Sequence, residues 1–123
     1  MKTNESAENY LETILILSQR LPVVRFIDVA TELGFKKSSV SVAMKHLREK
    51  NHITVSEAGY ITLTDAGREI AEMIYERHNI LTSMLVTLGV TPEIAAEDAC
   101  RIEHVISAES FAAIKDHFNS KKK

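Results

Sequence analysis

Apolar side chains recur every three or four residues over most of the chain, which is the spacing of amphipathic helices. The first such stretch covers residues 6–19 (SAENYLETILILSQ), the second covers 26–33 (FIDVATEL), and the third covers about 38–50. Either of the two serines that open the third stretch can cap a helix. Gly34 lies between the second and third stretches, where a left-handed turn residue is needed. Helix, short glycine-containing turn and helix together predict a helix-turn-helix.

The hydrophobic pattern changes after the third helix. Residues 53–55 (ITV) and 60–63 (YITL) are rich in β-branched and aromatic side chains, and a turn that contains Gly59 separates them. This pattern predicts two short strands joined as a β-hairpin. Because a hairpin directly after a helix-turn-helix is a wing, we predict a winged helix-turn-helix domain over residues 1–64.

Helical spacing returns for the rest of the chain. A long helix is predicted over about 65–88 and ends at Gly89. Thr91 and Pro92 then suit the cap and first position of a helix that runs to about Ile106. A last helix is expected from 107–109 to about Phe118, followed by a frayed NSKKK tail. The expected fold is therefore mainly α with a small β-hairpin wing, a winged domain over 1–64 followed by an all-helical domain over 65–123.

Composition limits the setting in which the protein works. A hydrophobic share of 45% in 123 residues supports a real core, and the short chain leaves room for dimerisation to add buried surface. No stretch approaches the roughly 18 apolar residues of a membrane helix, and the first residues lack the layout of a signal peptide. The single cysteine, Cys100, permits no internal disulfide. We therefore expect a cytoplasmic protein with no membrane partner.

Charge is distributed unevenly along the chain. The net charge of −2 does not indicate nucleic-acid binding, but five basic residues and one acid lie between Gly34 and Lys50. A solvated helix face is the alternative interpretation of this stretch. In a helix-turn-helix, the second helix enters the major groove of double-stranded DNA with its N-terminal residues. Lysines suit phosphate, hydroxyls suit phosphate or base edges, and an exposed valine can pack on a thymine methyl group. The predicted DNA-contacting residues are Lys36, Lys37, Ser38, Ser39, Ser41, Val42 and Lys45.

The stretch DACRIEHVIS, residues 98–107, carries the candidate chemistry. On a helix, Cys100, Glu103 and His104 would share one face because they are three and four residues apart. Thiolate, carboxylate and imidazole are common ligands of divalent transition metals. One helix rarely completes a coordination shell, so further ligands must come from elsewhere. The candidates are Asn9, Glu12 and His78. Each residue also has a plain structural interpretation, as a small buried hydrophobe, a solvated charge or an ordinary histidine.

The same stretch resembles the DEAC-R-x-EH-x-x-S block of the DtxR/MntR family of metal-dependent (iron/manganese) transcriptional repressors. Three other stretches are similar to that family: ENYLETI, the S-S-V-S run, and TLTDAGREIA followed by RHNIL. The resemblance extends in order from about Ser6 to Phe118. It implies a DNA-binding domain joined to a helical metal-binding and dimerisation domain. It also implies a homodimer on a palindromic DNA operator, a repressor of metal-ion homeostasis genes, and no enzymatic activity or small organic substrate.

The resemblance further implies a ligand set. Cys100, Glu103 and His104 match the family's motif, and His78 matches the histidine of the long helix. Glu12 matches a first-helix carboxylate of the manganese branch. Asn9 stands where the iron branch has Met and the manganese branch has Asp, so it follows neither.

Other positions depart from the family pattern. Cys100 follows the iron branch, whereas the manganese branch has a glutamate there. Thr82 and Ala96 replace ligands of the ancillary site in the iron branch, which puts that site in doubt. The sequence shows no counterpart of the SH3-like third domain of the longer iron regulators, so a two-domain form is expected.

The thiol directs the expected choice of metal. A thiolate favours softer or borderline ions such as Fe(II), Co(II), Ni(II) or Zn(II) over Mn(II). We therefore expect Fe(II) as co-repressor, Mn(II) as the second choice, and Zn(II), Co(II) or Ni(II) as ions that bind in vitro.

Three other functions remain open at this point. One is a winged-helix regulator that responds to an oxidant or another ligand rather than to metal. Another is a small metalloenzyme, although the sequence has no H-E-x-x-H and no Gly-rich phosphate cradle. The third is a winged-helix protein–protein adaptor, which would show no salt-dependent DNA binding. The apolar residues expected to divide between the dimer surface and the protomer core are Ile74, Ile80, Leu81, Met84, Leu85, Ile94, Val105, Ile106, Phe111 and Ile114.

Overall fold

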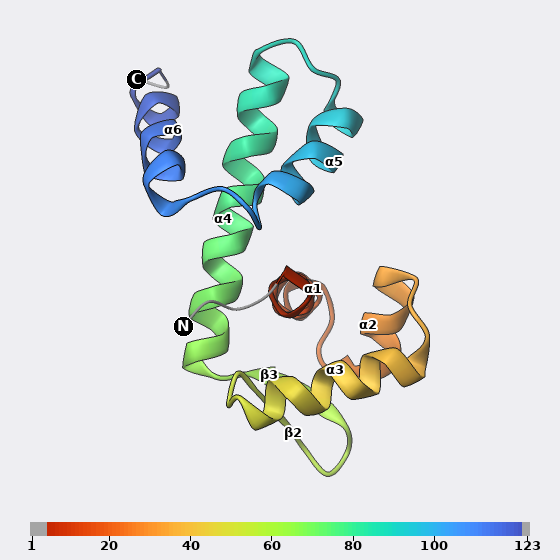
Figure 1. The fold of residues 1–123 in the computed structure, drawn as a ribbon. Coiled ribbons are helices and arrows are strands. Elements are labelled where there is room, and N and C mark those ends of the chain that lie inside the picture. Colours follow the sequence, from red (N-terminus) through yellow and green to blue (C-terminus); the bar gives the residue numbers. More distant parts are fainter. Residues whose placement is uncertain (1–4, 122–123) are drawn as a thin grey trace. The chain divides into compact units, whose positions relative to one another are not determined.

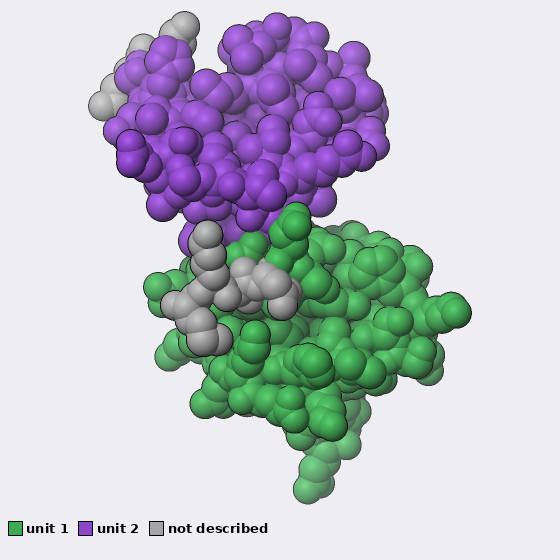
Figure 2. Space-filling model, in the orientation of Figure 1, with its two compact units in different colours: residues 1–72 green, residues 73–123 purple. Residues whose placement is uncertain are grey.

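The computed structural model describes residues 5–121, which form six helices and three short strands (Figure 1). The elements are α1 (Glu5–Arg20), β1 (Val24–Arg25), α2 (Phe26–Leu33), α3 (Lys37–Glu49), β2 (Ile53–Val55), β3 (Tyr60–Leu63), α4 (Asp65–Thr87), α5 (Pro92–Ile102) and α6 (Ala108–Lys121). The chain divides into two compact units, residues 1–72 and 73–123, and the boundary falls within α4 (Figure 2). The predicted class, mainly helical with a winged helix-turn-helix at the N-terminal end, is confirmed.

The core of the first unit is built around α1. Its apolar residues recur at helical spacing, and Leu11 and Ile14 are almost completely buried where α1 packs against α2, α3 and β3. Tyr10 meets the Phe35 ring edge-on, with the ring centroids 6.0 Å apart. Burial raises the pKa of the Tyr10 phenol, because a phenolate would lose its hydration there. α1 therefore acts as the central support of the winged domain.

The turn between α2 and α3 has the backbone that its glycine predicts. Gly34 adopts a φ of 69°, and the N–H of Phe35 donates to the Ala30 carbonyl to close the end of α2. α3 begins at Lys37, and within the described chain the N-cap residue Lys36 makes no side-chain cap bond. The prediction that Ser38 or Ser39 caps this helix is wrong, because both serines already lie inside its first turn.

The sheet has three antiparallel strands in the order β1-β3-β2. In the hairpin, Thr54 lies opposite Thr62, and Gly59 in the turn has a φ of 85°. β1 pairs with β3 through Val24 and Ile61. β1 was not predicted from the sequence, because two residues are too few to show alternation.

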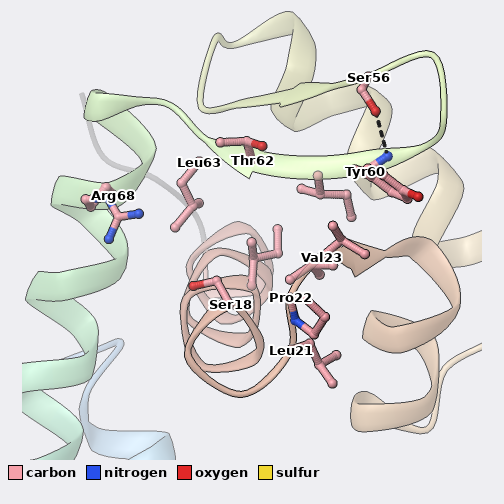
Figure 3. A pocket seen from close by; sticks show the side chains of 12 residues that line it. Ser18, Leu21, Pro22, Val23, Ser56, Tyr60, Thr62, Leu63 and Arg68 are labelled. Carbon is pink, nitrogen blue, oxygen red and sulfur yellow. Dashed lines mark hydrogen bonds between the residues drawn. The ribbon is translucent and has the colours of Figure 1, made fainter.

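A hollow of about 330 Å³ lies beside the wing (Figure 3). The end of α1, the segment 21–24, the hairpin and Arg68 of α4 form its walls. At its edge the N–H of Tyr60 donates to the Ser56 hydroxyl over 3.1 Å. Its lining contains no histidine, cysteine or carboxylate. This hollow therefore lacks the side chains that most often bind transition metals.

The start of α4 is fastened to the end of α3. The Thr64 hydroxyl donates to the Asn51 carbonyl over 2.7 Å and accepts from the N–H of Gly67 over 3.1 Å. Gly67 also passes so close to the His52 backbone that a Cβ at this position would collide with the His52 carbonyl oxygen. Gly67 lies within a helix, so its backbone conformation does not require glycine. Glycine is required here because a side chain would not fit against His52.

The second unit contains the rest of α4 together with α5 and α6. Ile74, Leu81, Ala95, Ala99 and Phe111 form its buried apolar centre. Some apolar residues were predicted to fill the protomer core and others to form a dimer surface. Of these, Ile74, Leu81 and Phe111 lie in the protomer's own core. Ile94 and Val105 are exposed by 50% and 72%, so they remain available to a dimer surface.

Two helix ends differ from the sequence predictions. α5 stops at Ile102 rather than near Ile106, and a turn follows it. α6 continues to Lys121 rather than ending near Phe118, so residues 119–121 are helical and not frayed, while Lys122 and Lys123 lie outside the described residues. The start of α6 is as expected, because the Ser107 hydroxyl accepts from the Ser110 N–H over 3.0 Å. No helix in the range 5–121 is both long and apolar enough to span a bilayer.

Candidate metal centre

His78 lies in the part of α4 that belongs to the second unit, and its ring faces the end of α5. Its Nδ1 is 2.8 Å from Oε1 of Glu103. The side chain of His78 is 27% exposed, so one side of the ring remains open to solvent. The short hydrogen bond fixes the ring orientation relative to the Glu103 carboxylate.

Glu103 occupies the C-cap of α5 and is completely buried. Its N–H still donates to the Ala99 carbonyl over 2.9 Å, so the last turn of the helix aims the carboxylate at α4. Oε2 lies 3.5 Å from Nε2 of His104, within the range of electrostatic attraction. This contact between His104 and Glu103 is not a hydrogen bond, and Oε2 has no hydrogen-bond partner among the described residues. One buried carboxylate therefore lies between two imidazoles with one oxygen unsatisfied.

This arrangement fits a divalent cation. Burying a carboxylate costs several kcal/mol unless a charge or hydrogen bonds compensate it, and the negative charge also lies at the unfavourable end of the α5 dipole. A cation at the unsatisfied oxygen would remove this cost, and imidazole nitrogens beside it are the ligands that transition metals accept. The donor set of His78, Glu103 and His104 is therefore chemically suited to such an ion.

Cys100 is placed differently from its two neighbours in the motif. It is exposed on α5, whereas Glu103 is completely buried. Of the three residues predicted to share one helix face, Cys100 lies within α5, Glu103 is its C-cap and His104 follows in a turn. A role for Cys100 as a ligand stays a prediction.

The two predicted ligands of the first helix belong to the other unit. Glu12 lies in the middle of α1 with only 6% of its surface exposed, and Asn9 lies half-buried one turn earlier. The backbone carbonyl of Asn9 accepts a hydrogen bond from the Thr13 hydroxyl over 2.8 Å. Thr82, which replaces an ancillary ligand of the iron branch, keeps a buried hydroxyl with no hydrogen-bond partner among the described residues.

Sequence reasoning missed Arg77. One of its nitrogens, Nη1, donates to the backbone carbonyls of both Glu103 and Ile106, each over 3.0 Å. Its place beside His78 was a weak signal, because an arginine on a helix is usually solvated.

The predicted DNA-contacting residues all lie on the exposed side of α3 or at its N-terminal end. Val40, Met44 and Leu47 point into the core, and Val42 between them is 57% exposed. The lysines and serines of the predicted set are exposed as well: Lys36, Lys37, Ser38, Ser39, Ser41 and Lys45. Their accessibility is as expected, while their contact with DNA stays a prediction.

These features together define a class of protein. A winged helix-turn-helix whose recognition helix exposes lysines and hydroxyls is built to bind DNA. The same chain carries a buried carboxylate between imidazoles, which suits a regulatory metal ion. The class is therefore that of metal-responsive DNA-binding regulators.

The chain belongs to the iron dependent repressor family. Residues 2–61 match the model of its N-terminal DNA binding domain, and residues 64–123 match the model of its metal binding and dimerisation domain. The protein is accordingly a metal-dependent, DNA-binding transcriptional repressor and not an enzyme. It acts with a divalent metal and carries the family's dimerisation domain.

Individual relatives agree with this membership. The transcriptional regulator MntR of Escherichia coli O6:H1 is 33% identical over 111 residues, which is 90% of this chain and 72% of MntR. An uncharacterized HTH-type regulator of Methanocaldococcus jannaschii is 32% identical, with 91% of each chain covered. A solved manganese-dependent transcriptional repressor in complex with manganese has a TM-score of 0.85 at 28% identity over 92% of this chain. Our chain spans 52% of that structure's length, about half.

Proposed function

We propose that this repressor uses Fe(II) as its co-repressor, with Mn(II) as the second candidate, and that His78, Glu103 and His104 form the centre of the ligand set. The observation that carries this proposal is the unsatisfied oxygen of the buried Glu103 carboxylate. Asn9 and Glu12 of α1 add oxygen ligands, and Cys100 adds sulfur. A bound divalent cation would offset the repulsion between the carboxylates of Glu12 and Glu103 and accept the imidazole nitrogens as ligands.

Cys100 is the residue on which the expected preference for Fe(II) over Mn(II) depends. Sulfur favours Fe(II) over the harder Mn(II), so a Cys100 thiolate in the ligand set selects iron. The exposed position of Cys100 and the manganese-dependent relative support Mn(II) as the second candidate.

DNA recognition follows from the family's two functions. We infer that a homodimer presents two α3 helices to a palindromic operator, whose half-sites lie on successive major grooves about 34 Å apart. Ligands drawn from residues 1–64 and from 65–123 would restrict the arrangements that the DNA-binding unit samples, so the metal-loaded dimer binds with a smaller conformational cost. The protein would act in this way in the cytoplasm, on genes of metal-ion homeostasis.

The test is operator binding by the full chain, first stripped with chelator and then titrated anaerobically with Fe(II), Mn(II), Zn(II) and Co(II). A switch of this kind is expected to tighten DNA binding by about 5- to 150-fold. His78→Ala should lose the metal response, whereas Asn79→Ala, at an exposed neighbouring position on α4, should keep it. Tight DNA binding that ignores both metal and chelator would refute metal control.

The exposure of Cys100 also favours one alternative, a repressor that senses oxidants. In that case reversible oxidation of the thiol would change operator affinity in chelator, and Cys100→Ala would abolish the change.

A further inference from the structure

Arg77 joins three parts of the second unit. From α4 its Nη1 donates to the carbonyls of Glu103 and Ile106, which lie at the two ends of the turn between α5 and α6. Its guanidinium also lies over the Phe111 ring of α6, with the central carbon 5.4 Å from the ring centroid. Arg77 therefore holds the turn that carries Glu103 and His104 from the neighbouring helix α4.

The chemistry of a helix end explains why this contact matters. The last four carbonyls of an α-helix lack partners within the helix. At the end of α5, the Ile102 carbonyl accepts from the N–H groups of Val105 and Ile106, and the Glu103 carbonyl accepts from Arg77. A cation at a helix C-terminus is also favoured by the helix dipole. Arg77 thus caps α5 from a neighbouring helix.

The capped residue is also the central member of the candidate metal site. The backbone of Glu103 is bound by Arg77, and its side chain is bound by His78, the next residue of α4. Two consecutive residues of α4 therefore fix the backbone and the side chain of Glu103. Shifting the turn would move the Glu103 carboxylate away from His78 and would move His104 with it.

We propose that Arg77 is a positioning residue for metal binding: it holds the 103–106 turn so that Glu103 and His104 face His78 before an ion arrives. This inference rests on the proposed metal site. Loss of groups that orient metal ligands typically costs 10- to 100-fold in metal affinity.

The sign of the effect separates this role from simple electrostatics. Arg77 is a positive charge close to a site for a cation, so Coulomb repulsion alone predicts that its removal tightens metal binding. Positioning predicts the opposite, a weaker affinity.

The experiment compares three variants of the full chain. Arg77→Met removes the donors and the charge but keeps an apolar stem against Phe111. Arg77→Lys keeps the charge and can still donate to a carbonyl, so it should rescue part of the affinity and should fold if the methionine variant does not. Lys115→Met is the matched control, because it removes a different link between α4 and α6, the Lys115–Glu76 ion pair of 2.8 Å, and leaves the turn untouched.

Two readouts are needed. Co(II) affinity by titration calorimetry, with Co(II) as an air-stable stand-in for Fe(II), should fall about 10- to 100-fold in Arg77→Met and less in Arg77→Lys. Amide hydrogen exchange in the metal-free protein should accelerate at Val105 and Ile106 by at least about tenfold. The amide of Ala95, which is bound to the Thr91 carbonyl at the other end of α5, should not change.

Lys115→Met should match the wild type in both readouts. Unchanged exchange at Val105 and Ile106 would overturn the positioning role, and so would Co(II) affinity that is unchanged or tighter in Arg77→Met. A wild type that binds no divalent ion would refute the proposed metal function, while the exchange comparison would still decide whether Arg77 holds the turn.

Discussion

At the scale of single residues, Glu103 is a buried acid that its described neighbours satisfy only in part. Its carboxylate is completely buried, one oxygen is bound to His78, and the other has no hydrogen-bond partner among the described residues. Buried polar groups in proteins are normally satisfied, so this exception supports the proposal that an ion binds here. If Glu103 binds the ion, as we propose, the metal-free protein is less stable because of this group.

Glu103→Gln should reverse this balance. The substitution keeps the shape and removes the buried charge, so the metal-free variant should be at least as stable as the wild type, with a gain of up to about 1 kcal/mol. The wild type should gain about 2.7 kcal/mol from metal at 100 times its dissociation constant, and the variant should gain nothing. Urea unfolding with chelator and with metal measures both quantities.

Glu97→Gln, the same change at an exposed position of α5, serves as the control and should leave both quantities unaltered. Metal-dependent stabilisation that survives in Glu103→Gln would remove Glu103 from the ligand set.

Cys100→Ser should change which metal is preferred rather than whether metal binds. If the thiolate is a ligand, replacing sulfur by oxygen should lower Fe(II) and Co(II) affinity relative to Mn(II) by about tenfold or more, because softer ions lose their preferred donor. Competition between Co(II) and Mn(II) for the protein, followed by metal analysis, gives the ratio. An unchanged ratio would show that Cys100 lies outside the coordination shell.

At the scale of elements, the junction between α3 and α4 has little room for change. The Thr64 hydroxyl links the Asn51 carbonyl to the Gly67 amide, and the Gly67 backbone lies directly against His52. Asn51 itself has a φ of 66°, a left-handed conformation that asparagine tolerates better than most residues. The recognition helix and the long helix are thus joined by close backbone contact.

Gly67→Ala should destabilise the protein although alanine favours helices by about 1 kcal/mol over glycine. The added Cβ meets the His52 carbonyl, and forcing atoms into a packed site costs about 1–3 kcal/mol. Thermal or urea unfolding measures the loss. Glu69→Ala, at an exposed position of the same helix, should stay within about 0.5 kcal/mol of the wild type. Stabilisation by Gly67→Ala would contradict the close approach.

The sequence predicted most elements because their periodicity is local. The helix-turn-helix and the wing follow from the 3.6- and 2-residue patterns together with Gly34 and Gly59. β1 was missed because its two residues gain their structure from pairing with β3. The end of α5 was missed because Val105 and Ile106 continue the apolar spacing, while Arg77 of another helix holds the turn that follows Ile102.

The candidate site was predictable to a different degree. The ligand types were visible in DACRIEHVIS, but the pairing of His78 with Glu103 joins residues 25 positions apart, so no local pattern could give it. The exposed position of Cys100 was not predictable either, because the spacing of a motif does not tell which of its residues the fold buries.

At the scale of the whole molecule, a net charge of −2 is combined with a local excess of basic residues on and around α3. DNA binding should therefore depend on this face rather than on overall charge. Its lysines and its exposed valine should contribute in different ways, since phosphate contacts carry no sequence information.

Lys45→Ala and Val42→Ala should separate the two contributions. Lys45→Ala should weaken binding to operator and random DNA alike and reduce the salt slope of log affinity by about 1. Val42→Ala should keep the slope and lose about 1 kcal/mol of preference for the operator. Fluorescence anisotropy over a range of salt concentrations measures both. Equal effects of the two variants on slope and preference would contradict the proposed orientation of α3.

The exposure of the single cysteine has a practical consequence. A maleimide or similar thiol reagent has one place to attack on each protomer, so the labelling stoichiometry counts protomers and the labelling rate reports on one turn of α5. The same chain, without any substitution, can therefore carry one fluorophore or spin label per subunit. Because Cys100 is also a proposed metal ligand, bound metal should slow this labelling, and an attached label would remove the thiolate from the ligand set.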